Sequence, residues 1–66
     1  MQLTVNGKKN AYEPDLTVSR LVQLLELKPK GVAIEVNREI VSKSRWDDHR
    51  LGDGDIVEIV TFVGGG

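Results

Sequence analysis

The sequence predicts an α+β domain in which one helix covers one face of a small β-sheet. Short runs of alternating apolar and polar residues are typical of half-buried strands, and one stretch places apolar residues at helical spacing. That stretch lies between two predicted hairpins, so its apolar face has a sheet to pack against. A chain of 66 residues has room for one domain with a small core and without a deep catalytic cleft.

The first hairpin starts at the beginning of the chain. Apolar and polar residues alternate over residues 1–5, which indicates a strand. Asn6-Gly7 follows and is a strong hairpin signal, because a type I′ turn needs positive φ at both central positions. We therefore predict a second strand over residues 8–12, which Pro14-Asp15 brings to an end.

The helix is predicted over residues 17–27. Thr17 is a favourable N-cap, typically worth about 1 kcal/mol over alanine. Lys28-Pro29 ends the helix, because the residue before proline is pushed out of the α region. Between these limits, residues at i, i+3, i+4 and i+7 form one apolar face: Val18, Leu21, Val22 and Leu25.

The second half of the chain returns to the sheet. Val32, Ile34 and Val36 occupy alternate positions and predict a third strand, and Ile40-Val41 forms a short fourth strand after a turn. The irregular segment that follows has Trp46 and Leu51 as its expected anchors. We interpret Trp46 as a core residue and not as a platform for ligand stacking. A turn at residues 52–55 leads into a last strand over residues 56–62, which is rich in β-branched side chains.

Alternation assigns the two faces of that last strand. If Glu58 faces solvent, Ile56, Val60 and Phe62 lie on the same side. The residues that then point inward are Val57, Ile59 and Thr61. The opposite register would place Phe62 in the core, but it would bury the Glu58 carboxylate. Exposed Val60 and Phe62, followed by Val63, would provide a docking surface for a partner. The residues expected in the core are Val5, Leu21, Leu25, Ile34, Val36, Val57 and Ile59.

The glycine tail is the most informative feature for function. Gly64, Gly65 and Gly66 directly follow the last strand. Glycine has little bulk and gains little from being ordered, so we expect residues 1–63 to form a single domain and residues 64–66 to form a flexible tail that enters a partner. Its reactive group would be the Gly66 carboxylate, with an ordinary pKa of roughly 3.3–3.7. This carboxylate is a poor acyl donor until it is activated, for instance as an acyl-adenylate. A frayed end is the alternative interpretation.

Composition excludes several classes of function. The formal net charge is −1, which gives no electrostatic footprint for nucleic acid. The absence of cysteine excludes disulfides, thiolate metal sites and a cysteine nucleophile, and it favours a cytoplasmic protein. The first residues carry neither a signal peptide nor a membrane span. His49, beside Asp47 and Asp48, is interpreted as a solvated side chain, so no metal site is predicted.

Acidic side chains crowd the last third of the sequence. They are Asp47, Asp48, Asp53, Asp55 and Glu58. Two interpretations are open: an ordinary solvated face, or a patch that steers the tail toward a basic partner surface. Asp53-Gly54-Asp55 also begins like a calcium loop, but Val57 stands where a further oxygen ligand is needed, so a plain turn is favoured.

Several segments together resemble one family. They are Leu51 to Val60, the run Val36-Asn37-Arg38-Glu39-Ile40-Val41, the Arg45-Trp46 pair, and the ending Val60 to Gly66. In this combination, and at this short length, the chain resembles the ubiquitin-like β-grasp sulfur carriers, in particular those of thiamine (thiazole) biosynthesis. The resemblance spans essentially the whole chain. It implies a β-grasp fold, with a mixed sheet of four or five strands and one helix packed across it.

The resemblance also implies a function. In such carriers an adenylating enzyme related to ubiquitin-activating enzymes uses ATP to convert the terminal carboxylate, here that of Gly66, to an acyl-adenylate. A cysteine desulfurase or sulfurtransferase supplies the sulfur that replaces AMP and leaves a thiocarboxylate, which thiazole synthase uses to build the thiazole ring. The chain would thus be a co-substrate without a bound cofactor, a monomer when free, and not an enzyme.

Two other functions share this tail or this fold. The small subunit of molybdopterin synthase carries the same thiocarboxylate to a different acceptor, although such subunits tend to be longer. A ubiquitin-like modifier would form isopeptide bonds with lysines, and a β-grasp domain could also serve for docking alone.

Overall fold

The computed structural model describes residues 1–62, and within them it contains a five-stranded sheet and one α-helix. Val63 and the predicted tail, residues 64–66, lie outside the described residues. The elements are β1 (Gln2–Val5), β2 (Lys8–Ala11), α1 (Val18–Leu24), β3 (Val32–Val36), β4 (Glu39–Val41), a short 3-10 helix (Lys43–Arg45) and β5 (Ile56–Thr61). The α+β class and the order hairpin, helix, hairpin, strand are as predicted.

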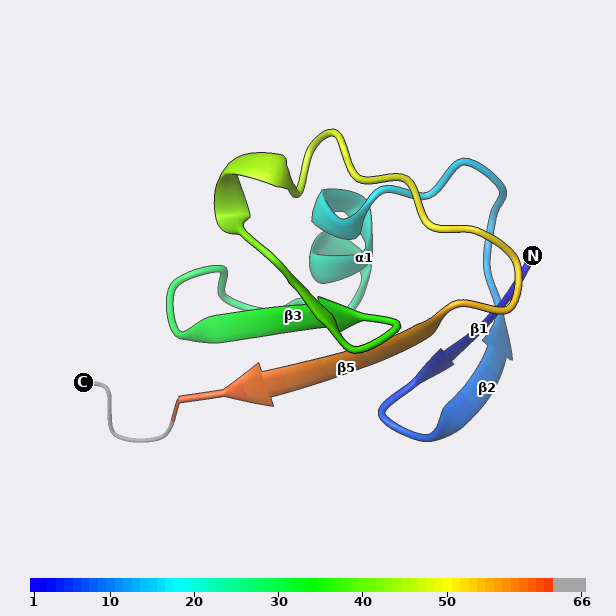
Figure 1. Cartoon of the computed structure of the whole chain (residues 1–66), viewed down its shortest axis with the longest axis horizontal. Coiled ribbons are helices and arrows are strands. Elements are labelled where there is room, and N and C mark those ends of the chain that lie inside the picture. Colours follow the sequence, from blue (N-terminus) through cyan, green and yellow to red (C-terminus); the bar gives the residue numbers. More distant parts are fainter. Residues whose placement is uncertain (63–66) are drawn as a thin grey trace.

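The sheet is mixed, as predicted, and β5 occupies its centre. The strand order is β2-β1-β5-β3-β4. Strand β5 pairs parallel with β1 and antiparallel with β3, and both hairpins are antiparallel. Figure 1 shows α1 and the segment after β4 on one side of the sheet. The last strand along the chain is therefore paired on both sides with earlier strands.

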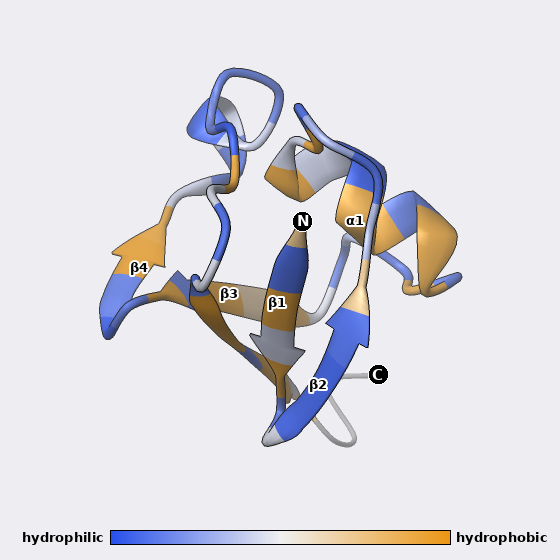
Figure 2. Cartoon of the chain, turned by 90° about the vertical axis from the view of Figure 1, so that its right-hand side faces the viewer, coloured by the Kyte–Doolittle hydropathy of each residue, from blue (hydrophilic) through white to orange (hydrophobic). Residues whose placement is uncertain are grey.

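The two edges of the sheet are short and different in character. Most of β2 is hydrophilic, as Figure 2 shows, and all four of its residues are exposed. Its Lys8 and Lys9 discourage pairing with the edge of another sheet. Strand β4 forms the other edge and has only three residues.

Helix α1 begins as predicted but is shorter than predicted. The Thr17 hydroxyl accepts a hydrogen bond from the backbone N–H of Arg20 at 3.1 Å, which confirms it as the N-cap. The helix ends at Leu24, because Glu26 adopts a left-handed conformation with φ of 55°. The N–H groups of Glu26 and Leu27 return to the carbonyls of Gln23 and Val22, and these two bonds form a Schellman motif.

The early end of α1 corrects one core prediction. Leu25, expected in the core as part of a longer helix, caps the helix and is 37% exposed. Leu21, Ile34, Val36 and Val57 are buried as predicted. Val5 and Ile59 are partly buried and pack against the core. The structure also buries the expected anchors Trp46 and Leu51 and six further residues: Leu3, Leu16, Val18, Val22, Val32 and Val41.

The segment between β4 and β5 is held down by the two predicted anchors. Trp46 is buried, and its indole Nε1–H donates to the Val41 carbonyl at 2.9 Å. Leu51 is also buried, and its backbone N–H donates to the Leu16 carbonyl at 2.8 Å. Trp46 is therefore a core residue, as interpreted from the sequence, and the segment closes one end of the core.

Alternation along β5 follows the predicted register, although one residue on the inward side is exposed. Val57 is fully buried and Ile59 is half-buried, whereas Glu58, Val60 and Phe62 are exposed. Thr61, expected to point inward, is paired with buried Val32 and so lies on the covered side of the sheet, but it is exposed there. Strand β1 pairs with β5 only near Ile56 and Val57, so the far end of β5 has a strand neighbour on the β3 side alone.

Candidate functional site

The candidate site is the end of β5 and the sheet face around it. The pairing of β3 with β5 runs as far as Thr61 opposite Val32. Beyond it, the backbone N–H of Phe62 donates to the Gly31 carbonyl at 2.8 Å. The chain is therefore fixed up to Phe62, four positions before Gly66. The backbone hydrogen bonding of β5 thus extends to Phe62, the last residue that the structure describes.

Two asparagines extend the hydrogen bonding of β5 where its neighbouring strands stop. The Asn6 side chain accepts from the Ile59 N–H at 2.7 Å, and its Nδ2 lies 3.4 Å from the Ile59 carbonyl. The Asn37 side chain accepts from the Ile56 N–H at 3.0 Å. Each asparagine lies at positive φ in a hairpin turn. The sequence identified Asn6 as a turn residue and placed a turn before Ile40, but it gave no signal for this second role of the two asparagines, which depends on strands distant in the chain.

The acidic turn before β5 uses two of its carboxylates to hold the strand in place. The Asp53 carboxylate accepts from the backbone N–H of Gln2 at 2.7 Å. One oxygen of Asp55 accepts from the Gly52 N–H at 2.7 Å, and the other accepts from the Asn37 side chain at 3.0 Å. These contacts support the interpretation of residues 52–55 as a turn. They also give Asp53 and Asp55 a structural role that the steering interpretation did not anticipate.

The face of the sheet opposite α1 is open and carries exposed apolar side chains. Val60 is 45% exposed and Phe62 is 60% exposed, as expected for the proposed docking residues. Ile56 at the start of β5 and Ile40 on the neighbouring hairpin are also exposed. Val63, the third predicted docking residue, and the tail residues Gly64, Gly65 and Gly66 lie outside the described residues.

Two glutamates occupy the middle of the same face. Glu35 on β3 is paired directly with Glu58 on β5, and on its other side with Ile40 on β4. Because directly opposed residues share a face of a sheet, these three side chains form a row across the three strands. The sequence singled out Glu58 as an outward residue but gave no signal for Glu35 as its neighbour.

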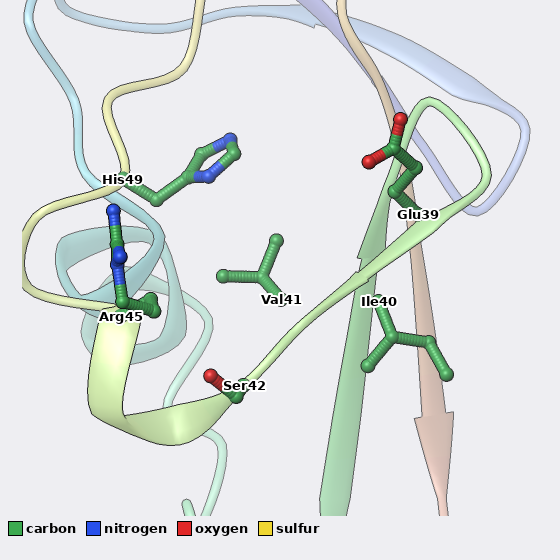
Figure 3. A pocket seen from close by; sticks show the side chains of 6 residues that line it. All are labelled: Glu39, Ile40, Val41, Ser42, Arg45 and His49. Atoms are coloured by element: carbon green, nitrogen blue, oxygen red, sulfur yellow. The ribbon is translucent and has the colours of Figure 1, made fainter.

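A shallow groove lies at the β4 edge, on the covered side of the sheet. Its volume is about 200 Å³, and its lining residues are Glu39, Ile40, Val41, Ser42, Arg45 and His49 (Figure 3). Val41 points toward the loop that carries Arg45 and His49, whereas Ile40 points away from it (Figure 3). Among residues 1–62, no group of three histidine, cysteine or acidic side chains is arranged to hold a metal ion. Nor is any helix of this part of the chain long and apolar enough to cross a membrane.

The comparisons with known proteins agree on one family. The sequence pattern of the ThiS family matches residues 3–66. The chain is 42% identical over 65 residues to the sulfur carrier protein ThiS of Bacillus subtilis, and the match covers 97% of this chain and 98% of the relative. The crystal structure of the thiamine biosynthesis protein ThiS from Geobacter metallireducens superimposes with a TM-score of 0.87 at 36% identity and covers 100% of both chains.

A further relative is much longer than this chain. The thiazole synthase of Paramagnetospirillum magneticum is 41% identical to it over 66 residues. The match covers 100% of this chain, but the chain spans only 20% of that relative. That thiazole synthase therefore contains a segment similar to this chain within one polypeptide.

Proposed function

The chain belongs to the ThiS family, and we propose that it carries sulfur as a thiocarboxylate on Gly66. It is a sulfur carrier of thiamine biosynthesis with a β-grasp fold, and it is not an enzyme. The observation that carries the proposal is the family match, which extends through residue 66 and so includes the glycines beyond β5. The relatives also favour the thiamine pathway over the molybdopterin pathway and over protein modification.

The proposed chemistry takes place on the carboxylate while partner enzymes hold the tail. The Gly66 carboxylate attacks the α-phosphate of ATP and releases pyrophosphate, which leaves an acyl-adenylate. The outer sulfur of a protein persulfide then attacks the acyl carbon and displaces AMP, which gives an acyl disulfide. A second thiol attacks the donor cysteine sulfur of this disulfide and forms a new disulfide with it, and the thiocarboxylate on Gly66 is the leaving group. The chain itself supplies only the glycine segment and its carboxylate. It needs no catalytic side chain, because the partner enzymes catalyse each step.

We propose two kinds of enzyme partner that must each reach Gly66. One is an adenylating enzyme similar to ubiquitin-activating enzymes, with a cysteine desulfurase or sulfurtransferase as the source of sulfur. The other is thiazole synthase, and the relative that contains a carrier-like segment within a thiazole synthase supports this partner. Because Gly66 lies four residues beyond Phe62, an extended tail reaches at most about 13–14 Å from it. Each partner therefore contacts the end of β5, where Val60, Phe62 and Val63 would dock.

Removal of the terminal glycines tests the proposal. Deletion of Gly66, or of Gly65 and Gly66 together, should abolish adenylation and sulfur transfer. The fold should remain, because the buried core residues of the described part of the chain lie between Leu3 and Val57, well before the deleted glycines. The measurements are ATP–pyrophosphate exchange with the adenylating enzyme and circular dichroism of each truncated protein. Normal adenylation and thiolation of a truncated chain would refute the assignment of Gly66.

Intact mass provides an independent measurement. Protein purified from its own host should contain a fraction in which one oxygen has been replaced by sulfur, and this fraction should be absent from the truncated chains. Adducts linked to lysine side chains of other proteins would instead identify a modifier. The matched control is a Lys9→Ala variant, because Lys9 lies on the exposed edge strand β2 and should leave the sulfur-bearing fraction unchanged.

A further inference from the structure

We propose that the adenylating enzyme inserts an arginine side chain between Glu35 and Glu58 on the open face of the sheet. This inference rests on the proposed function and names the chemistry of the partner at the surface around β5. Three observations carry it: the two carboxylates are directly opposed, residues 1–62 supply no cation to them, and exposed apolar side chains surround them.

The opposition of Glu35 and Glu58 is unfavourable in the isolated carrier. They are partners in the antiparallel register of β3 and β5, which places their Cβ atoms about 4.5–5.5 Å apart. Like charges directly opposite each other destabilise a sheet. Within the described residues the only ion pair joins Arg20 to Glu13 at 3.8 Å, so neither Glu35 nor Glu58 has a basic partner there. A cation from another molecule would remove this repulsion.

Apolar side chains border the two carboxylates. Ile40, which is paired with Glu35, is 74% exposed, the highest exposure among the large apolar residues that the structure describes. Val60 follows Glu58 by two positions along β5 and Ile56 precedes it by two positions, so both side chains lie on the same face as Glu58. A partner that covers these side chains would exclude water from the carboxylates. Exclusion of water strengthens a hydrogen-bonded charge pair, so the border makes this location suitable for a bound cation.

Arginine fits this site better than lysine does. Its guanidinium is planar and carries five N–H donors, so it can donate to two carboxylates at once. It is also weakly hydrated, which lowers the cost of its burial in an apolar border. The acidic turn before β5 is less suited to this role, because Asp53 and Asp55 already accept hydrogen bonds from Gln2, Gly52 and Asn37. Charge complementarity therefore points to a basic side chain of the adenylating enzyme at Glu35 and Glu58.

The test is the kinetics of ATP–pyrophosphate exchange as a function of carrier concentration, with the full chain and the adenylating enzyme. In a Glu35→Gln, Glu58→Gln double variant, KM for the carrier should rise about tenfold or more, while kcat stays close to normal. Its melting temperature should equal or exceed that of the unmodified protein, because the repulsion is gone. An unchanged KM in the folded double variant would overturn the proposal.

Two comparisons separate charge pairing from a structural effect. Glu39→Gln removes one carboxylate from the hairpin that carries Glu35, but Glu39 lines the groove on the covered side, so KM of this variant should be unchanged. Added salt should raise KM of the unmodified carrier more steeply than KM of the double variant, because salt screens the pair. Equal salt dependence of the two proteins would contradict the proposal.

Failure of this inference and failure of the proposed function give different results. If the unmodified carrier supports no exchange at any concentration, the proposed function fails, and this inference fails with it. If the unmodified carrier supports exchange, the truncated chains do not, and the double variant has a normal KM, then only the pairing with arginine is wrong.

Discussion

The two faces of the sheet are built from the same alternating strands, yet they differ in what they contain. The covered face carries Leu3, Ile34 and Val57, all nearly inaccessible to solvent, against Leu21 of α1. The open face carries exposed Ile40 and Val60 beside two opposed glutamates, and exposed Phe62 follows directly after β5. One face has the composition of a core. The other has an arrangement that does little for the stability of the free protein.

This difference separates stability from recognition. A buried aliphatic side chain contributes roughly 1.5–3 kcal/mol relative to an exposed one, so the covered face supplies most of the energy that holds the sheet and helix together. Exposed apolar residues and a like-charge pair contribute nothing comparable to stability, and a contiguous exposed apolar patch is typical of a surface that binds a partner. Substitutions on the two faces should therefore change different measurable quantities.

The largest expected effect is on the covered face. Leu21→Ala should lower the free energy of unfolding by about 2–5 kcal/mol, because Leu21 has no exposed surface and its removal leaves a cavity. Leu25→Ala, the matched control on the same segment, should cost less than about 1 kcal/mol, since Leu25 is 37% exposed. Urea denaturation monitored by circular dichroism measures both values. Equal losses in the two variants would contradict the described end of α1.

An intermediate effect is expected from substitutions on the open face. These should weaken binding to the adenylating enzyme and leave the free energy of unfolding largely unchanged. Val60→Asp or Phe62→Asp should raise KM of the adenylating enzyme for the carrier by about tenfold or more, because a buried carboxylate without a partner loses its hydration. The value of kcat should remain close to normal once the carrier is saturating. Steady-state ATP–pyrophosphate exchange provides the measurement. Unchanged KM for both folded variants would show that docking uses a different surface.

The smallest expected effect concerns the start of the helix that covers the core. Thr17→Ala should lower the free energy of unfolding by about 1 kcal/mol, because the hydroxyl accepts a hydrogen bond from the Arg20 N–H. Thr17→Ser keeps this acceptor and should be nearly neutral. Both variants should leave KM unchanged, since Thr17 lies away from the open face. A raised KM in the Thr17→Ala variant would contradict the conclusion that the covered face determines stability and the open face determines binding.

The sequence by itself determined the elements and the faces of the strands. Alternation located β1, β3 and β5, Asn6-Gly7 located the first hairpin, and Thr17 located the start of α1. These signals are local, because each depends on residues within a few positions of one another. The same local period predicted that Val60 and Phe62 are exposed, which the structure confirms. The family resemblance, supported by the relatives, gave the function.

The tertiary structure alone decided where α1 ends and which side chains meet across the sheet. Helix α1 ends at Leu24, and Glu26 just beyond it adopts the left-handed conformation for which glycine is the usual residue. The sequence therefore carried no signal for the end of the helix, and the prediction that Leu25 lies in the core was wrong. The opposition of Glu35 and Glu58, and the contact of Asn6 with Ile59, join positions far apart in the chain. Local periodicity fixes which face a residue occupies, but the register between distant strands is fixed only when the helix and the loops close over the sheet.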